Sequence, residues 1–276
     1  MKPLLSVVTV NFNNMAGLES TLASVSSQSF ADYEHIIIDA GSTDGSADVV
    51  RRYAESSPHC TFWVSEPDNG IYDGMNKGID HASGEYLLFM NSGDYLDGRD
   101  VLSRVTFDGS DYIYGDVKVV LASGETVYVR SPYPLDPVFI LLKDTICHQS
   151  CFINRRLFRD GQRYRTDYVL ASDWIHIVEN LVLKNGTCRY EPVCIAVHDG
   201  NGISATSGTL GVDERMRWIR ENIPRMFYDA LVELDEYRSS EFGALIPKLK
   251  GHRTFARWAR RLVRDLFRIY SLFVKK

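Results

Sequence analysis

The sequence predicts an α/β fold, in which a mostly parallel sheet carries helices on both faces and a helical extension follows at the C-terminus. Apolar runs alternate with helical patterns as far as residue 90, which is typical of parallel strands joined by helices. The run Ile36–Ile38 is continuous and apolar, as expected of a strand buried on both faces. Beyond residue 208 the patterns are helical only, so the extension is predicted to lack strands.

The elements of the N-terminal half follow from apolar spacing and from the residues that interrupt it. Residues 4–10 are β-branched and apolar, and Met15, Leu18 and Val25 then recur at helical spacing. Glycine and serine in residues 41–46 end the second strand and cap the next helix. The predicted strands cover residues 4–10, 34–39, 61–64 and 85–90, with helices after residue 14, up to about residue 54, and over 71–82.

The second half is more mixed. Residues 122–124 separate two strand-like runs and predict a hairpin, whereas Pro132, Pro134 and Pro137 mark a loop. Helical spacing over 172–183 ends at Asn185-Gly186. The remaining predicted strands cover 111–114, 117–121, 125–130, 150–153 and 188–197, and a Gly- and Ser-rich loop covers 198–208. We expect three parts: a globular domain over 1–208, a helical extension over 209–247 and a basic amphipathic helix over 248–276.

Length and cysteine usage restrict the class of protein. The 276 residues suit one large domain, with or without a small extension. Five cysteines without a C-x-x-C pair predict structural thiols in a reducing compartment. Cys147 and Cys151 flank His148, but a second ligand pair for zinc is missing. The N-terminus shows no signal peptide, and no segment has the roughly 20 apolar residues that span a bilayer.

Charge divides the chain into two regions. The net charge is −5, yet residues 248–276 hold ten basic residues against one acid, so this tail carries +9 and the other 247 residues carry −14. Trp258, Leu262, Leu266 and Ile269 form an apolar stripe along the tail, and such a basic amphipathic helix suits an anionic membrane surface. Packing on its own domain or an oligomer interface is the alternative. The acidic body and the absence of a motif argue against nucleic acid.

Polar residues follow the fourth predicted strand. Asp94 lies just beyond the apolar run, and Asn91 and Ser92 precede it, so hard oxygen ligands for Mg²⁺ or Mn²⁺ meet where ligands bind in open α/β sheets. The alternative is that residues 91–94 form only a turn. Asn76 and Lys77 lie on the preceding helix and are expected to face a diphosphate.

Three passages together resemble glycosyltransferase family 2, which has the GT-A fold. Residues 6–13 (SVVTVNFN) are similar to the opening strand and donor loop of the family, and residues 24–30 with 36–46 are similar to its second block. Residues 65–72 (SEPDNGIY) resemble most closely the bacterial enzymes of the colanic-acid and exopolysaccharide type. Weaker similarities follow at 148–149, 171–173 and 202–204.

The resemblance implies transfer of a sugar from a nucleotide-sugar, usually UDP-linked, to a hydroxyl with inversion at the anomeric carbon. It implies that Asp39 binds the nucleoside, that Asn11 and Asp68 contact the donor, and that a carboxylate after the fourth strand handles metal and diphosphate. Members of the family commonly show Asp-x-Asp there, whereas this chain has Asn-Ser-Gly before Asp94. Related polysaccharide enzymes carry this form, so it is interpreted as a variant of the site.

Inversion in one displacement needs a base, and Asp173 is the candidate. It follows Ser172 at a predicted helix start, where the helix dipole favours the carboxylate, and the alternative is that it only caps the helix. His148 and Gln149 are expected on the acceptor side, unless the histidine is a core residue. His198 is expected to complete the metal site. Trp174 and Tyr72 are interpreted as packing residues.

The leading hypothesis is therefore an inverting, metal-dependent glycosyltransferase of bacterial surface polysaccharide synthesis. It would act on a glycan or polyprenyl-diphosphate-linked acceptor, in the cytoplasm and peripherally on the inner face of the cell membrane. A nucleotidyltransferase would need a Gly-rich, basic loop after the first strand, and residues 11–14 are not one. A dinucleotide dehydrogenase is excluded because G-x-G-x-x-G is missing. An inactive, membrane-bound homologue remains the third hypothesis.

Overall fold

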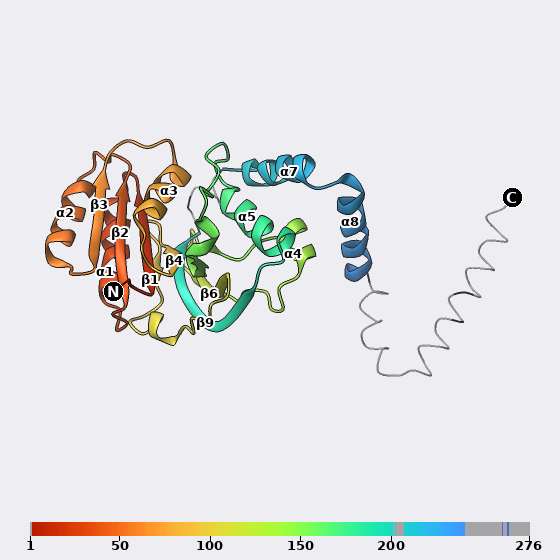
Figure 1. Cartoon of the computed structure of the whole chain (residues 1–276), viewed down its shortest axis with the longest axis horizontal. Coiled ribbons are helices and arrows are strands. Elements are labelled where there is room, and N and C mark those ends of the chain that lie inside the picture. Colours follow the sequence, from red (N-terminus) through yellow and green to blue (C-terminus); the bar gives the residue numbers. More distant parts are fainter. Residues whose placement is uncertain (1, 201, 203–206, 241–260, 262–263, 265–276) are drawn as a thin grey trace. The chain divides into compact units, whose positions relative to one another are not determined.

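A computed structural model describes residues 2–200, 202, 207–240, 261 and 264 (Figure 1). The chain divides into two compact units, residues 1–221 and 222–276. This division lies later than the expected boundary at 208, because the first helix of the extension belongs to the first unit and buries Trp218 and Ile219. The expected tail helix over 248–276 lies outside the described residues, except for positions 261 and 264.

Among the described residues of the first unit, nine strands form a single sheet in the order β3-β2-β1-β4-β8-β6-β9-β5, with β7 paired to β6. The N-terminal part is parallel and consists of β1 (Leu5–Asn11), β2 (Tyr33–Asp39), β3 (Cys60–Ser65) and β4 (Tyr86–Phe89). Asn11 pairs with Asp39 in the register of β1 and β2. The carboxyl ends of these strands therefore meet at one edge, where ligands bind in open α/β sheets.

Helices cover both faces of the parallel strands. On one face α1 (Met15–Ser26) and α2 (Ser46–Ser56) bury apolar residues against Ile37 of β2. On the other face α3 (Ile71–His81) lies so close to β1 that a Cβ on its Gly78 would stand 2.3 Å from Val8. The predicted α/β fold class with helices on both faces is confirmed.

The second half adds four antiparallel pairs and one parallel pair to this sheet. The strands of this half are β5 (Tyr95–Leu96), β6 (Tyr112–Val120), β7 (Thr126–Val129), β8 (Cys151–Asn154) and the twelve-residue β9 (Cys188–Asp199). The hairpin of β6 and β7 is as predicted. The two strands expected over 111–114 and 117–121 are one strand, since Gly115 lies close against Ile195 at a register shift instead of breaking the chain.

Some helical elements differ from the expectation. The expected loop is present at Pro132 and Pro134, whereas Pro137 begins a short helix, α4 (Pro137–Leu142), because Asp136 caps it and proline suits its first position. The helix predicted over 172–183 consists of α5 (Ser172–Ile177) and the π-helical η4 (Val178–Leu183). The short 3₁₀ turns are η1 (Leu102–Arg104), η2 (His148–Ser150) and η3 (Arg155–Phe158), and the last described helices are α7 (Leu210–Asn222) and α8 (Arg225–Ser239). Over the described ranges, no helix combines the length and apolarity needed to cross a bilayer.

Candidate functional site

Asp39 and Asn11 form a polar pair where β2 and β1 end. The Asn11 amide nitrogen donates to Asp39 Oδ1 at 2.7 Å, and Ser42 and Ser65 donate to the same carboxylate. Burial opposes ionisation, but these hydrogen bonds outweigh it and hold the pKa of Asp39 below its usual value. Asn11 Oδ1 is buried and has no partner within the described part of the chain. The Asn11 oxygen, held in place by Asp39, thus offers an acceptor to a ligand that brings an N–H or O–H group.

Residues 91–94 do form a turn, and that turn carries the carboxylate. The Asp94 N–H donates to the Asn91 carbonyl at 3.0 Å, and the Ser92 N–H donates to the Val10 carbonyl of β1 at 3.0 Å. Thr21 of α1 donates to the Asp94 carbonyl at 2.6 Å. The two interpretations of this passage are therefore compatible, since the turn fixes Asp94 beside the end of β1.

The hydrogen bonds of the Asp94 carboxylate offset its burial only in part. Its residue is 7% exposed, Gln149 donates to Oδ2 at 3.0 Å, and the Asp199 N–H lies 3.4 Å from Oδ1. Burial raises the pKa of the Asp94 carboxyl above its usual value, and Gln149, His148 and His198 oppose this only in part. A cation beside Asp94 would favour its ionised form.

A divalent ion fits this corner if a diphosphate helps to hold it. Asn91 Oδ1 is buried without a partner among the described residues, and it lies in the same turn as Asp94. Over the described ranges no group of three or more His, Cys, Asp or Glu side chains could bind a metal alone. Mg²⁺ often uses one or two protein ligands together with substrate phosphates, so Asp94 and Asn91 match that demand.

Asp173 lies at the start of α5 and joins two other elements. Tyr72 of α3 donates to its Oδ1 at 2.8 Å, and His148 Nδ1 lies 3.4 Å from its Oδ2. Its side chain is 16% exposed, so a substrate oxygen can reach the carboxylate. Burial alone would raise its pKa, but His148 and the Tyr72 hydrogen bond outweigh burial and hold the pKa of Asp173 below its usual value. Asp173 is therefore ionised at neutral pH.

The dipeptide His148-Gln149 connects the two carboxylates. Asn91 Nδ2 lies 3.1 Å from His148 Nε2, while His148 Nδ1 faces Asp173. Gln149 donates to Asp94, and its Oε1 accepts from the Cys147 thiol at 2.8 Å. The predicted residues Asn91, Asp94, His148, Gln149 and Asp173 thus belong to one hydrogen-bonded network.

The other predicted residues form their hydrogen bonds and ion pairs outside this network. Asp68 accepts from the Gly70 N–H and shapes the loop before α3. Lys77 pairs with Glu66 at 2.8 Å. Asn76 is committed to the Tyr164 backbone through both amide atoms. His198 lies near enough to Asp94 to influence its pKa, and its Nδ1 lies 3.4 Å from the Asp199 carbonyl.

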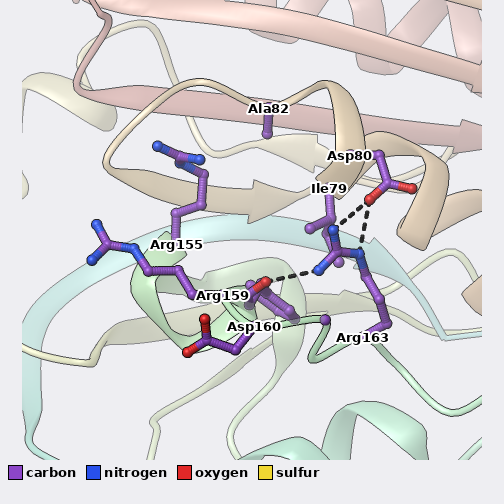
Figure 2. A pocket seen from close by; sticks show the side chains of 9 residues that line it. Ile79, Asp80, Ala82, Arg155, Arg159, Asp160 and Arg163 are labelled. Carbon is purple, nitrogen blue, oxygen red and sulfur yellow. Dashed lines mark hydrogen bonds and ion pairs between the residues drawn. The ribbon is translucent and has the colours of Figure 1, made fainter.

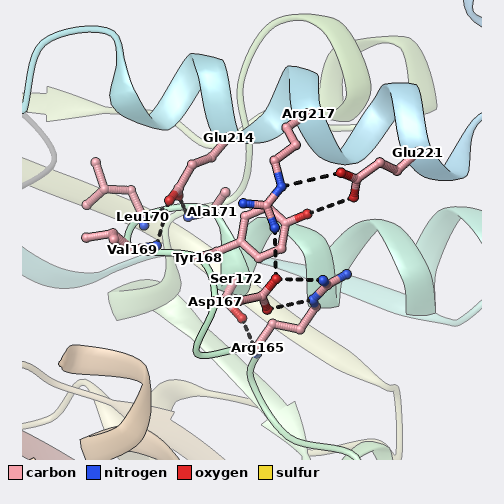
Figure 3. Close-up of polar contacts among 10 residues, drawn as sticks. All are labelled: Arg165, Asp167, Tyr168, Val169, Leu170, Ala171, Ser172, Glu214, Arg217 and Glu221. Atoms are coloured by element: carbon pink, nitrogen blue, oxygen red, sulfur yellow. Dashed lines mark hydrogen bonds and ion pairs between the residues drawn. The ribbon is translucent and has the colours of Figure 1, made fainter. Parts of the chain in front are cut away.

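Glu214 of α7 fixes the segment that leads into Asp173, and sequence reasoning missed this residue. Its carboxylate accepts from the backbone N–H groups of Val169, Leu170 and Ala171 at 2.7, 2.8 and 3.0 Å (Figure 3). Arg165 and Arg217 both lie against the Tyr168 ring and both pair with Asp167. No local sequence pattern predicts the hydrogen bonds of Glu214, because its partners are more than 40 residues away.

A separate hollow of about 400 Å³ lies at the other end of β4 (Figure 2). The Arg155 N–H donates to the Glu85 carbonyl just before β4, whereas Asp94 follows the strand. Arg155, Arg159 and Arg163 line the hollow, and Arg163 pairs with Asp80 at 2.5 Å. None of the residues predicted for the site lies there.

Comparison with known proteins agrees with the resemblance found in the sequence. The model of the family described as "Glycosyl transferase family 2" matches residues 6–160, more than half of the chain. A "PGL/p-HBAD biosynthesis glycosyltransferase" of Mycobacterium bovis is 33% identical over 205 residues, which cover 72% of this chain and 78% of that protein.

Solved structures share the fold. The mannosyltransferase PcManGT of Pyrobaculum calidifontis, in complex with GDP-Man and Mn²⁺, matches with a TM-score of 0.63 at 16% identity, over 99% of this chain and 83% of that chain. TarS 1–349 of S. aureus, in complex with UDP-GlcNAc, matches with a TM-score of 0.57 at 18% identity, over 75% and 61%. This chain covers 45% of a longer TarS structure. At such identities the likeness shows the fold alone.

Proposed function

The chain belongs to glycosyltransferase family 2 and is a glycosyltransferase, and on this premise we propose that it moves a sugar from a UDP-sugar to a hydroxyl with inversion. The observation that carries the proposal is the connection between Asp94 and Asp173 through His148-Gln149. The Asp94 carboxylate is buried with too few hydrogen bonds to offset its burial, as expected of a cation site. The Asp173 carboxylate is ionised and partly exposed, as expected of a base.

In the proposed reaction the acceptor oxygen bonds to the anomeric carbon while the bond from that carbon to the diphosphate oxygen breaks. The electron pair of the broken bond leaves with the nucleoside diphosphate, and the acceptor proton passes to Asp173. Asp94 and Asn91 would hold Mg²⁺ or Mn²⁺. Such an ion supplies charge stabilisation for the departing diphosphate. His148 keeps the Asp173 carboxylate oriented from the side opposite to Tyr72.

At the nucleoside, the free oxygen of Asn11 is the proposed acceptor for the imide N–H of uracil, and Asp39 orients it through the Asn11 amide nitrogen. The TarS complex with UDP-GlcNAc supports a uridine nucleotide, while the PcManGT complex with GDP-Man makes guanosine the second candidate. Asp68 and Lys77 lie on the loop and helix before β4, and we place them on the donor side with Asn76 and Ser92 in supporting roles.

For the acceptor we propose a glycan or a lipid-linked sugar in the synthesis of a surface polysaccharide or glycolipid. The name of the mycobacterial relative supports a glycolipid product. The +9 charge of residues 248–276 supports a peripheral position on the anionic inner face of the cell membrane.

The test begins with a panel of UDP- and GDP-sugars, with and without Mn²⁺, in which release of the nucleotide is measured. With the selected donor, Asp173→Asn should bind UDP normally and lose at least about 10²-fold in turnover, as expected of a general base. In the structure the N-cap of α5 is Ala171, and no side chain caps this helix. Turnover near the wild-type value, with only a lowered melting temperature, would show that Asp173 has a structural role and is not the base.

A further inference from the structure

Tyr72 makes a contact that its expected packing role does not require. Its ring is buried, with the residue 6% exposed, and its hydroxyl donates to Asp173 Oδ1 at 2.8 Å across a separation of 101 residues. A buried tyrosine hydroxyl needs some partner, but here the partner is an ionised carboxylate at the candidate site. The contact joins the first turn of α3 to the first turn of α5.

Asn76, one turn further along α3, strengthens the same connection. Its amide nitrogen donates to the Tyr164 carbonyl at 2.8 Å, and its amide oxygen accepts from the Tyr164 N–H at 2.9 Å. Residues four apart lie on one face of a helix, so Tyr72 and Asn76 hold the segment 164–173 at two points. The Tyr72 and Tyr164 rings also pack together, with centroids 5.6 Å apart.

We propose that Tyr72 is a positioning residue for the reaction, which fixes the Asp173 carboxylate through Oδ1 and turns its remaining lone pairs to the acceptor hydroxyl. This inference rests on the proposed function, in which Asp173 is the base. Without the tyrosine hydroxyl the carboxylate keeps the hydrogen bond from the Trp174 backbone. Its remaining side-chain partner among the described residues is His148, whose Nδ1 lies at the longer distance of 3.4 Å. The carboxylate can then rotate away from the orientation that the displacement needs.

Most of the ionisable groups around Asp173 carry no charge at neutral pH, so the influence of Tyr72 on the pKa of Asp173 can be measured. The ionisable side chains that interact with it are Tyr72, His148, Tyr164, His176, Cys147 and Cys151. Burial lowers the pKa of His176 to about 3, raises that of Cys147 to about 12 and raises those of the two tyrosines and Cys151 far above their usual values. These five groups are therefore uncharged at neutral pH.

Removing the Tyr72 hydroxyl takes away a hydrogen bond that favours the ionised form of Asp173, so the pKa of Asp173 should rise. A base with a raised pKa is lost to protonation at a higher pH. The acid limb of the kcat profile should therefore move to higher pH in the variant, and this displacement does not depend on how much of the preparation is folded.

The experiment compares Tyr72→Phe with wild type and with Tyr33→Phe, using the donor chosen by the panel and water as acceptor. Tyr33 is also buried and donates one hydrogen bond, to the Val25 carbonyl, but it lies at the opposite end of β2 from Asp39. We expect Tyr72→Phe to lower kcat by roughly tenfold, the low end of what a hydrogen bond to a charged group contributes. Its Kd for UDP should stay unchanged, and its acid limb should move to higher pH. Tyr33→Phe should change melting temperature only.

The inference on Tyr72 would be overturned if Tyr72→Phe kept the wild-type kcat and an unmoved acid limb. If Asp173→Asn were inactive at the same time, the proposal that Asp173 is the base would still stand. A loss of melting temperature and UDP affinity with an unmoved acid limb would overturn it too, since the tyrosine would then only pack. Normal turnover of Asp173→Asn would instead reject the proposed base itself.

Discussion

Glu214→Gln tests how firmly the approach to Asp173 is held. In the structure Oε1 accepts from Val169, and Oε2 accepts from both Leu170 and Ala171. A glutamine that keeps its oxygen at the Oε2 position still satisfies two of these donors. Its amide nitrogen then faces the Val169 N–H, so one donor loses its partner and meets another donor.

The expected loss of stability follows from the one backbone donor that is left without an acceptor. Glu214 is 8% exposed, and an unsatisfied buried donor costs about 1–3 kcal/mol. For a unit of this size about 1–3 kcal/mol lowers the melting temperature by about 2–12 °C. Glu214→Ala leaves all three donors without the carboxylate and should cost more, although water entering the space limits the loss.

The assay is a thermal melt followed by circular dichroism, with urea unfolding as a second measure of the free energy of unfolding. The matched control is Glu221→Gln on the same helix, because that side chain is 51% exposed and its contact with Tyr168 is long, at 3.4 Å. The control should change stability by less than about 0.5 kcal/mol. Melting of Glu214→Gln within 1 °C of wild type, taken as roughly the error of such a melt, would refute the inferred clamp.

Two further predictions concern the ion and the tail. Asp94→Ala should abolish turnover and leave the fold intact, because Thr21 holds the Asp94 backbone carbonyl and not its side chain; near-normal, Mn²⁺-dependent turnover would contradict its role at the metal. Deleting residues 251–276 should leave a folded protein that binds UDP and no longer sediments with anionic liposomes. High salt should partly mimic the deletion, since the screening length is already about 8 Å at physiological ionic strength. Indifference of the full chain to such liposomes at low salt, or insolubility of the truncated chain, would count against a membrane role.

The sequence predicts best what is decided locally. The strands of the parallel half and the helices between them are set by apolar periodicity and by Gly-Ser breaks, and the structure confirms each within a residue or two. Asp39 and Asp94 could be singled out because strand ends in a parallel sheet meet at one edge. Their hydrogen-bonding partners, by contrast, depend on the three-dimensional path of the chain.

What the sequence could not predict depends on distant partners. Residues 112–120 continue as one strand because β9 pairs along them through a register shift, which no local pattern shows. Tyr72 looks like a packing residue until Asp173, 101 positions away, is placed beside its hydroxyl. Glu214 lies among other charged residues of an amphipathic helix, and only the fold distinguishes it from them.

The thiol next to His148 gives the site a built-in chemical reporter. The Cys147 thiol donates to Gln149, and burial raises its pKa to about 12, so almost none of it is thiolate at neutral pH. Alkylating reagents should therefore modify the exposed Cys188 long before Cys147. Slow modification of Cys147, followed by mass spectrometry, would measure how accessible the His148-Gln149 segment is. Slower labelling in the presence of a donor would indicate that the donor binds near this segment.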